Sequence, residues 1–277
     1  MGNSAILSDR AIVVVEGTEA RNFLQGLITN DIARCSPGNG VYAALLTPQG
    51  KILFDFFIIQ DGQQFLLDCA AATAAGLVKR LGLYRLRAKV QIAPRPDLSV
   101  AAVWHEPLPA SFQGVIAYSD PRLATLGIRL VGGPQQIEAA TASVPRGDYD
   151  SFRLSLGIPD SADLPPDQVF ALDAALEELD GVSFSKGCYV GQEVTARMKH
   201  RATARRRFYI AKARPLPAAG TAIQAEGREL GRMATGKGEH ALALVRLDRL
   251  AQAEAAHARM EADGTLVVLR RPDWLHA

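Results

Sequence analysis

The sequence predicts an α+β protein, in which an antiparallel sheet with helices on one face is followed by a small C-terminal β-barrel. The N-terminal third alternates strand and helix patterns in an order typical of layered α+β domains. The final third changes to short strands separated by turns, which is typical of a small barrel. The chain has 277 residues, 48% hydrophobic and 22% charged, which is enough for about two globular domains. We place these domains at residues 1–203 and 204–277.

The N-terminal elements follow from hydrophobic spacing. The β-branched run Ala11–Val15 predicts a strand, and the apolar residues of Ala20–Leu27, at helical spacing, predict a helix directly after it. A second helix, predicted in the same way, covers Ala74–Leu86. The remaining strands expected in this part are Val41–Leu46, Lys51–Ile59, Phe65–Cys69 and Lys89–Ala93.

The middle of the chain gives weaker patterns than the two ends. The strands expected there are Leu98–Trp104, Gly114–Tyr118 and Leu126–Val131, and the helices are Gln135–Ser143 and Tyr149–Leu156. From Arg205 onward, β-rich runs separated by turns predict the barrel. Its expected strands are Arg207–Ala213, Thr221–Ala225, Glu229–Thr235, His240–Leu247 and Thr265–Arg270.

Charge and targeting signals narrow the functional classes. The net charge is only +2, so no global field attracts nucleic acid. Met1–Asp9 lacks the basic and apolar regions of a secretory signal, and Ile52–Ile59 is too short to span a bilayer. We therefore expect a cytoplasmic protein without a membrane partner, and we expect a monomer because no pairing element is evident.

The cysteines and histidines argue against common metal and disulfide sites. Cys35, Cys69 and Cys188 are far apart and form no Cys-x-x-Cys pair, which makes a disulfide framework or structural zinc site improbable. They would have to meet in space to hold an iron–sulfur cluster, and their spacing does not support this. The histidines also lack metal-ligand spacing, so we expect no bound metal.

Cys188 is the first candidate for chemistry. Val190, Val194 and Met198 repeat every four residues, which predicts a helix with Cys188 at or near its N-terminus. Backbone N–H groups at that end, together with the ammonium of Lys186, would favour a reactive thiolate. The alternative is that Cys188 is a small buried hydrophobic residue, as most free cysteines are.

Three segments carry a resemblance to a known family. The run Lys186–Glu193, Lys-Gly-Cys-Tyr-Val-Gly-Gln-Glu, matches the K-G-C-Y-x-G-Q-E signature of the YgfZ family. Gly17–Asp31, with Phe-Leu-Gln-Gly-Leu-Ile-Thr-Asn-Asp, resembles a segment that YgfZ proteins share with the aminomethyltransferase of glycine cleavage. Pro48–Lys51, leading to Asp55, is the third match. One departure is Ala202, where relatives usually carry glycine.

The resemblance implies both a fold and a function. The fold would be a folate-binding region of two ferredoxin-like halves, followed by the small barrel. Tetrahydrofolate or a one-carbon derivative would bind in a central cavity. The protein would help to assemble or repair iron–sulfur clusters, with a downstream effect on tRNA modification. Its partners would be folate and iron–sulfur proteins or their assembly machinery. Cys188 would be the working thiol, with Lys186 and Asp55 as the other catalytic candidates.

Several polar residues are candidates for the folate site. Asp55 lies in an otherwise apolar strand, where an unpaired carboxylate is unfavourable, so it either binds a partner or faces water at a strand edge. The resemblance favours a role beside the folate nitrogens. The other candidates offer amide, hydroxyl or carboxylate groups to a pterin or to the Cys188 site, although helix-end residues also carry such groups without binding a ligand. They are Gln25, Thr29, Asn30, Gln192 and Glu193.

A basic run follows the signature. From Val194 to Ala225 there are eight positive charges and no acidic residue. Such a run is usually a solvated face that balances acidic neighbours. The alternatives are a site for the glutamate tail of folate or for RNA phosphates. Aromatic residues are sparse here, which favours the folate tail, and Arg197 is the best candidate because it shares a helix with the signature.

Two competing functions remain. A folate-dependent aminomethyltransferase would have the same fold, but that enzyme needs no cysteine, so the Cys188 signature argues against it. An RNA-binding protein would use the basic run 197–214, and its binding would fall steeply with salt and would not depend on Cys188.

Overall fold

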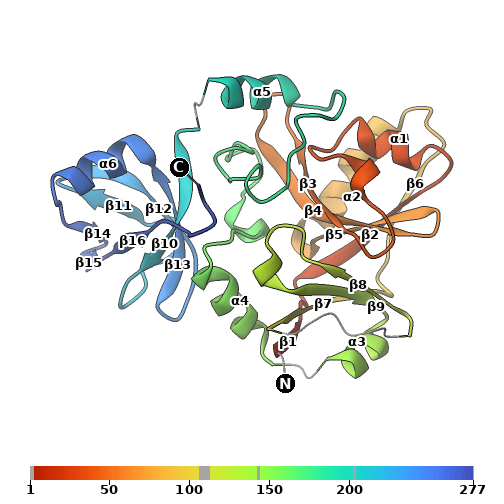
Figure 1. Ribbon diagram of the computed structural model, residues 1–277, viewed down its shortest axis with the longest axis horizontal. Helices are drawn as coiled ribbons and strands as arrows, with labels where there is room; N and C mark the ends of the chain where they lie inside the picture. Colours follow the sequence, from red (N-terminus) through yellow and green to blue (C-terminus); the bar gives the residue numbers. More distant parts are fainter. Residues whose placement is uncertain (1–2, 106–112, 142–143, 202–203, 277) are drawn as a thin grey trace.

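The structure is a computed structural model that describes residues 3–105, 113–141, 144–201 and 204–276. Within these residues the strands form three sheets, two in an α+β region and one in a C-terminal barrel. Figure 1 shows the barrel at one end of the molecule, with α5 (Gln192–His200) near the place where the chain passes from the α+β region into the barrel. No helix in the described ranges is both long and apolar enough to cross a bilayer.

The first sheet contains the strands that the sequence predicts in the N-terminal third. Its order is β3-β4-β5-β2-β6, and all neighbours are antiparallel. The strands are β2 (Arg10–Glu16), β3 (Val41–Leu46), β4 (Ile52–Asp61), β5 (Gln64–Ala70) and β6 (Gln91–Pro94). The predicted helices are present as α1 (Ala20–Gln25) and α2 (Ala71–Arg85). Buried side chains of both helices and of this sheet share one apolar cluster, so the helices cover one face of the sheet.

The second sheet has the order β1-β7-β9-β8, and its edge strand was missed by the sequence analysis. Asn3–Ile6 has no run of β-branched residues, and β1 forms only because it pairs with the distant Ser99–Trp104. The elements are β1 (Asn3–Ile6), β7 (Ser99–Trp104), β8 (Val115–Ser119), β9 (Ile128–Gly132), α3 (Pro134–Ala140) and α4 (Arg146–Ser155). The last two residues of the helix predicted over Gln135–Ser143 lie outside the described residues.

One apolar cluster joins the two sheets of the α+β region. It contains Leu46 and Phe57 from the first sheet and Trp104 from the second. Tyr149 of α4 packs against Trp104, with 5.5 Å between the ring centroids. Burial of large apolar side chains is the main stabilising contribution to a fold. The two sheets therefore form one packed unit, and the outer faces carry separate clusters under their helices.

The barrel contains the predicted strands, with Thr265–Arg270 divided into two, and adds one strand and one helix that the sequence analysis missed. Its strand order is β15-β14-β11-β12-β13-β10-β16. The strands are β10 (Arg206–Lys212), β11 (Ala222–Ala225), β12 (Arg228–Lys237), β13 (His240–Arg246), β14 (Met260–Ala262), β15 (Thr265–Leu266) and β16 (Val268–Arg270). The alanine-rich helix α6 (Leu247–Ala255) buries Leu250 and Ala253 against the barrel core. Ala202 and the boundary predicted at Thr203 lie outside the described residues.

Candidate functional site

The cysteines occupy different environments. Of the three, all of which the structure describes, Cys188 is exposed and the other two are buried. Burial raises the pKa of the Cys35 thiol to about 11 and that of Cys69 to about 12. Because the thiolate is the reactive form of cysteine, both buried thiols are inert at neutral pH. Cys188 is therefore the cysteine that a partner can reach from solvent.

Lys186 anchors the loop that carries Cys188, which we call the Cys188 loop (residues 183–191). Its ammonium donates hydrogen bonds to the carbonyl oxygens of Gln25, Ile28 and Asn30, at 2.7, 2.6 and 2.9 Å. These carbonyls lie at and just beyond the end of α1. An ammonium has three N–H donors, so the three acceptors satisfy it fully although it is buried. Burial lowers the pKa of Lys186 to about 8, and the Asp31 carboxylate opposes that shift.

The far end of the Cys188 loop is fixed by a glycine. Gly191 has φ +83°, and a Cβ atom added there would lie 2.5 Å from the carbonyl oxygen of Thr47. The left-handed conformation and the close approach both require glycine at this position. Gly191 also ends the loop, because α5 begins at Gln192. The loop is therefore held at Lys186 and at Gly191, with Cys188 exposed between them.

The helix start differs from the sequence prediction. The apolar spacing places Cys188 at or near a helix N-terminus, but α5 begins four residues later, at Gln192. The spacing is misleading because Val190 lies before the left-handed turn at Gly191 and packs with the cluster under α1 and α2. The ammonium of Lys186 is likewise fully used by backbone carbonyls. Lys186 and Gly191 of the signature thus position the Cys188 thiol by anchoring the loop that carries it.

Thr29 and Asn30 lie beneath the Cys188 loop. The Thr29 hydroxyl donates to the Gly181 carbonyl at 2.7 Å and accepts from the Ala44 N–H at 2.8 Å. The Asn30 amide donates to the carbonyls of Tyr42 and Asp180, at 2.9 and 2.6 Å. Both side chains are completely buried. Their hydrogen bonds join residues 180–181, directly before the loop, to β3. Their predicted contact with a pterin remains a prediction.

Gln25 is placed in the same way at the end of α1. Its side-chain amide donates to Asp31 at 3.0 Å, and its carbonyl oxygen accepts the Ile32 N–H at 2.9 Å. Its backbone carbonyl is one of the three acceptors of Lys186. Gln25 therefore organises the segment after α1, and its predicted role toward folate is likewise a prediction.

Asp55 is the buried carboxyl that the sequence singles out, and the structure places it on β4. Tyr42 on the neighbouring strand donates its hydroxyl to Asp55 Oδ2 at 3.2 Å. Burial raises the pKa of Asp55, while Arg10 lowers it and Asp160 raises it further. Although burial alone would raise the pKa of Asp160, Arg10 and Arg153 hold it well below its usual range.

The two carboxyls thus have pKa values displaced in opposite directions, upward for Asp55 and downward for Asp160. Tyr42 links this pair to the Cys188 loop, because its hydroxyl contacts Asp55 and its carbonyl accepts from Asn30. The Asn30 carbonyl in turn accepts from Lys186. The structure thus connects two sequence candidates, Asp55 and Lys186, through hydrogen bonds.

A buried ion-pair cluster, Arg10, Arg122, Arg129, Asp68 and Asp120, lies beside Asp55. Arg10 and Arg129 both bind Asp68, at 2.7 and 2.6 Å, and Arg122 binds Asp120 at 2.8 Å. All five side chains are buried.

The three guanidiniums of this cluster lie within 4.0–5.5 Å of the Phe57 ring centroid, on the same strand as Asp55. Sequence reasoning missed them, although Arg129 gives the same signal as Asp55, namely a charge within an apolar strand.

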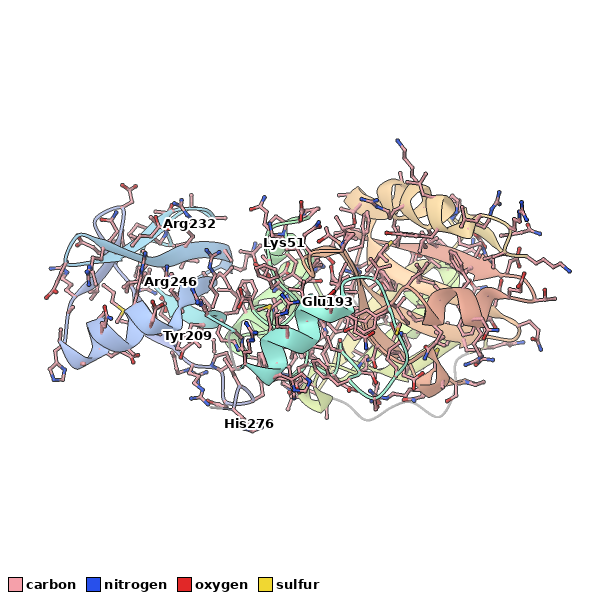
Figure 2. The ribbon with its side chains drawn as sticks, turned by 90° about the horizontal axis from the view of Figure 1, so that it is seen from above. Lys51, Glu193, Tyr209, Arg232, Arg246 and His276 are labelled. Atoms are coloured by element: carbon pink, nitrogen blue, oxygen red, sulfur yellow. The ribbon has the colours of Figure 1, made fainter. Side chains whose placement is uncertain are left out.

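The signature residues after the loop, Gln192 and Glu193, lie at the start of α5 and not in the Cys188 loop. Gln192 begins α5, and Glu193 pairs with Arg197 one turn later on the exposed face. Arg197 lines a cleft between the α+β region and the barrel. Lys51 and Arg246 border the same cleft from the two sides, and Figure 2 shows them on the α+β region and the barrel respectively. Their predicted roles in cofactor binding remain predictions.

Comparison with known proteins decides the family. The mouse mitochondrial iron–sulfur cluster assembly factor IBA57 is 35% identical over 284 residues, covering 88% of this chain and 77% of the mouse protein. The human protein of the same name is 34% identical, covering 97% of this chain and 84% of its own length. The chain belongs to the IBA57 family of iron–sulfur cluster assembly factors. A model of the CAF17 C-terminal β-barrel domain also matches residues 205–277.

A solved structure confirms the predicted fold class. The glycine cleavage system aminomethyltransferase T from Bartonella henselae superposes with a TM-score of 0.75 over 99% of this chain and 86% of that chain. The sequence identity is 17%, so this likeness establishes the fold alone. The chain is an aminomethyltransferase-like α+β region followed by a CAF17-type barrel.

The IBA57 relatives correct the expected location. The sequence analysis expected a cytoplasmic protein, and this is wrong, because the relatives in mouse, human and Neurospora crassa are mitochondrial. The expectation depended on the missing secretory signal at Met1–Asp9. That feature separates secreted from retained proteins and does not distinguish the cytosol from mitochondria.

Proposed function

We propose that this IBA57-family chain is a tetrahydrofolate-binding accessory protein that assembles or repairs iron–sulfur clusters, with Cys188 as its working thiol. The observation that carries the proposal is the exposed Cys188 on a loop that is fixed at both ends by Lys186 and Gly191. Iron–sulfur clusters are bound by cysteine thiolates. A rigid, exposed thiol therefore suits contact with iron, or with a cluster carried by a partner.

The anchoring of the loop at Lys186 and Gly191 favours binding to a protein partner. A thiol that is pre-positioned loses little conformational entropy when it binds. The Lys186 ammonium already donates its three hydrogen bonds to carbonyl oxygens, so Cys188 can bind a partner without breaking them. The partners under this proposal are iron–sulfur proteins or their assembly machinery. An effect on tRNA modification would follow downstream, through modification enzymes that carry such clusters.

The chemistry of Asp55 supports its proposed role beside a folate ring. Asp55 has a raised pKa and a Tyr42 hydroxyl at one oxygen, so it can donate a hydrogen bond to a ring nitrogen or accept one from a ring N–H. Asp160, which remains ionised, keeps a fixed negative charge beside it. A bound tetrahydrofolate would supply the one-carbon chemistry of its reduced ring. The chain itself would orient the ring and hold or release a proton at Asp55.

Replacement of Asp55 by asparagine is expected to weaken tetrahydrofolate binding by about tenfold or more, because it removes a charge-assisted hydrogen bond. Calorimetric titration of wild type and variant measures this directly. Asp61→Asn is the matched control, because Asp61 is the exposed last residue of the same strand. An unchanged dissociation constant in Asp55→Asn would remove Asp55 from the site. Failure of the wild type to bind would remove folate from the proposal.

A further inference from the structure

A strongly basic cleft lies between α5, the segment 168–173 and the barrel. It encloses about 610 Å³ and is lined by six cationic side chains and a single acidic one, Asp173, among the described residues. The cations are Lys51, Arg197, Arg201, Arg205, Arg206 and Arg246. Like charges gathered on a concave surface repel one another and concentrate the field inside it. The cleft is therefore suited to an anionic ligand.

Three of these cations have partners outside the cleft. Lys51 pairs with Asp167 at 3.9 Å. Arg197 pairs with Glu193, and Arg246 pairs with Asp248. These ion pairs are all partly exposed, so each contributes little and an incoming anion can replace it.

The other three cations have no such partners. The side chains of Arg201, Arg205 and Arg206 form no ion pair with any residue that the structure describes. Asp173 forms no ion pair with them: its Oδ1 accepts the backbone N–H groups of Arg205 and Arg206, at 3.2 and 3.3 Å, and its carboxylate attracts the Arg206 guanidinium only over a longer distance. Burial also raises the pKa of Asp173, although those backbone N–H groups oppose the shift. The cleft thus keeps unpaired guanidiniums for a ligand.

The shape and chemistry of the cleft favour a short chain of carboxylates. Its volume lies within the range of about 300–1,000 Å³ that is typical of small-molecule sites. Guanidinium groups bind carboxylates through two parallel hydrogen bonds. Single-stranded RNA would also need a series of stacking surfaces. Phe170 is the one aromatic side chain among the described lining residues, and the Lys51 ammonium lies 6.0 Å from its ring centroid.

The position of the cleft relates it to Asp55. Lys51 directly precedes β4, and Asp55 is four residues further along that extended segment. At about 3.3 Å per residue, the two positions are separated by about 13 Å. This is comparable with the part of a folate that separates its ring from its glutamate. The cleft therefore lies within the length of a folate from Asp55.

We propose that the basic cleft binds the oligoglutamate tail of a folate. The inference rests on the proposed function, and it adds a tail site built from both the α+β region and the barrel. Each added glutamate brings one carboxylate, and the unpaired guanidiniums of Arg201, Arg205 and Arg206 receive them.

The test compares tetrahydrofolate monoglutamate and pentaglutamate by titration at low salt. Wild type is expected to bind the pentaglutamate about tenfold more tightly or better, because several charge-assisted hydrogen bonds are added. In the double variant Arg201→Ala/Arg206→Ala the ratio of the two dissociation constants is expected to fall to about one. Arg228→Ala/Arg259→Ala is the matched control, because it removes the same charge from exposed positions on the barrel and should keep the ratio.

The outcomes separate the two proposals. If wild type binds both folates equally, or if the double variant keeps the gain, the tail site is wrong and the Asp55 site stands. If neither folate binds, both proposals are wrong. If single-stranded RNA binds wild type and not the double variant, while the glutamate chain gives no gain, the cleft is an RNA site and the inference is overturned.

Discussion

Cys188→Ala is expected to abolish function in cells that lack their own version of the protein, while it leaves the fold intact. Cys188 is exposed, and the Cys188 loop is held by Lys186 and Gly191, so the loss of one sulfur atom removes no structural contact. The readout is growth on conditions that require iron–sulfur enzymes, together with the circular dichroism spectrum and melting temperature of the purified variant.

Cys35→Ala is the matched control for this experiment. Cys35 is a buried thiol with a raised pKa, and its Sγ contacts the Ile58 carbonyl at 3.4 Å. Its replacement leaves a small cavity that costs about 1 kcal/mol of stability and should preserve rescue. Full rescue by Cys188→Ala would show that the exposed thiol is not the working group. Loss of rescue in both variants would point to instability instead.

Asp68→Asn is expected to lower the free energy of unfolding by about 3–5 kcal/mol, the usual effect of breaking a buried ion pair from one side. Asp68 is fully buried and is the shared partner of Arg10 and Arg129, with contacts of 2.7 and 2.6 Å. Asparagine keeps the shape but removes the shorter ion pair of each buried guanidinium, leaving Arg10 with Asp160 at 3.4 Å and Arg129 with Asp120 at 3.7 Å. Urea unfolding followed by tryptophan fluorescence measures the change, since Trp104 belongs to the same core.

Asp97→Asn provides the comparison, because Asp97 pairs with Arg95 at a similar distance of 2.7 Å on the exposed surface. Solvent and salt screen such pairs, so no measurable change is expected there. Equal changes in the free energy of unfolding for the two substitutions would show that burial adds nothing to the contribution that the Asp68 ion pairs make to stability. A large loss in Asp68→Asn alone supports the view that these charges hold the two sheets together.

The sequence predicted most of the elements because their hydrophobic patterns are local. Val41–Leu46 was placed to the residue, since a continuous β-rich run bounded by turns defines a strand without reference to the rest of the chain. The edge strand Asn3–Ile6 was missed because its conformation depends on pairing with Ser99–Trp104. The helix Leu247–Ala255 was missed because it buries only Leu250 and Ala253, which is too few apolar residues to give a clear helical spacing.

The sequence identified residues of the candidate site, but it did not predict the contacts that they make. Asp55 was found because a carboxyl in an apolar strand is a local anomaly, and the structure buries it. Its partners Arg10 and Asp160 are 150 residues apart in sequence and meet only in the folded chain. Lys186 was expected beside a thiolate, and the structure instead places its ammonium among carbonyls after α1. Hydrogen-bond partners from distant segments cannot be read from spacing.

The most direct test of the central claim follows cluster assembly itself. Purified protein, with tetrahydrofolate, is added to an apo-ferredoxin that is being loaded with iron and sulfide by an assembly scaffold, and the visible absorption of the cluster is recorded. We predict that the wild type accelerates cluster formation. With Cys188→Ala, we predict the same rate as in the reaction without the protein. Equal rates for wild type, Cys188→Ala and the protein-free reaction would contradict a role of Cys188 in iron–sulfur cluster assembly.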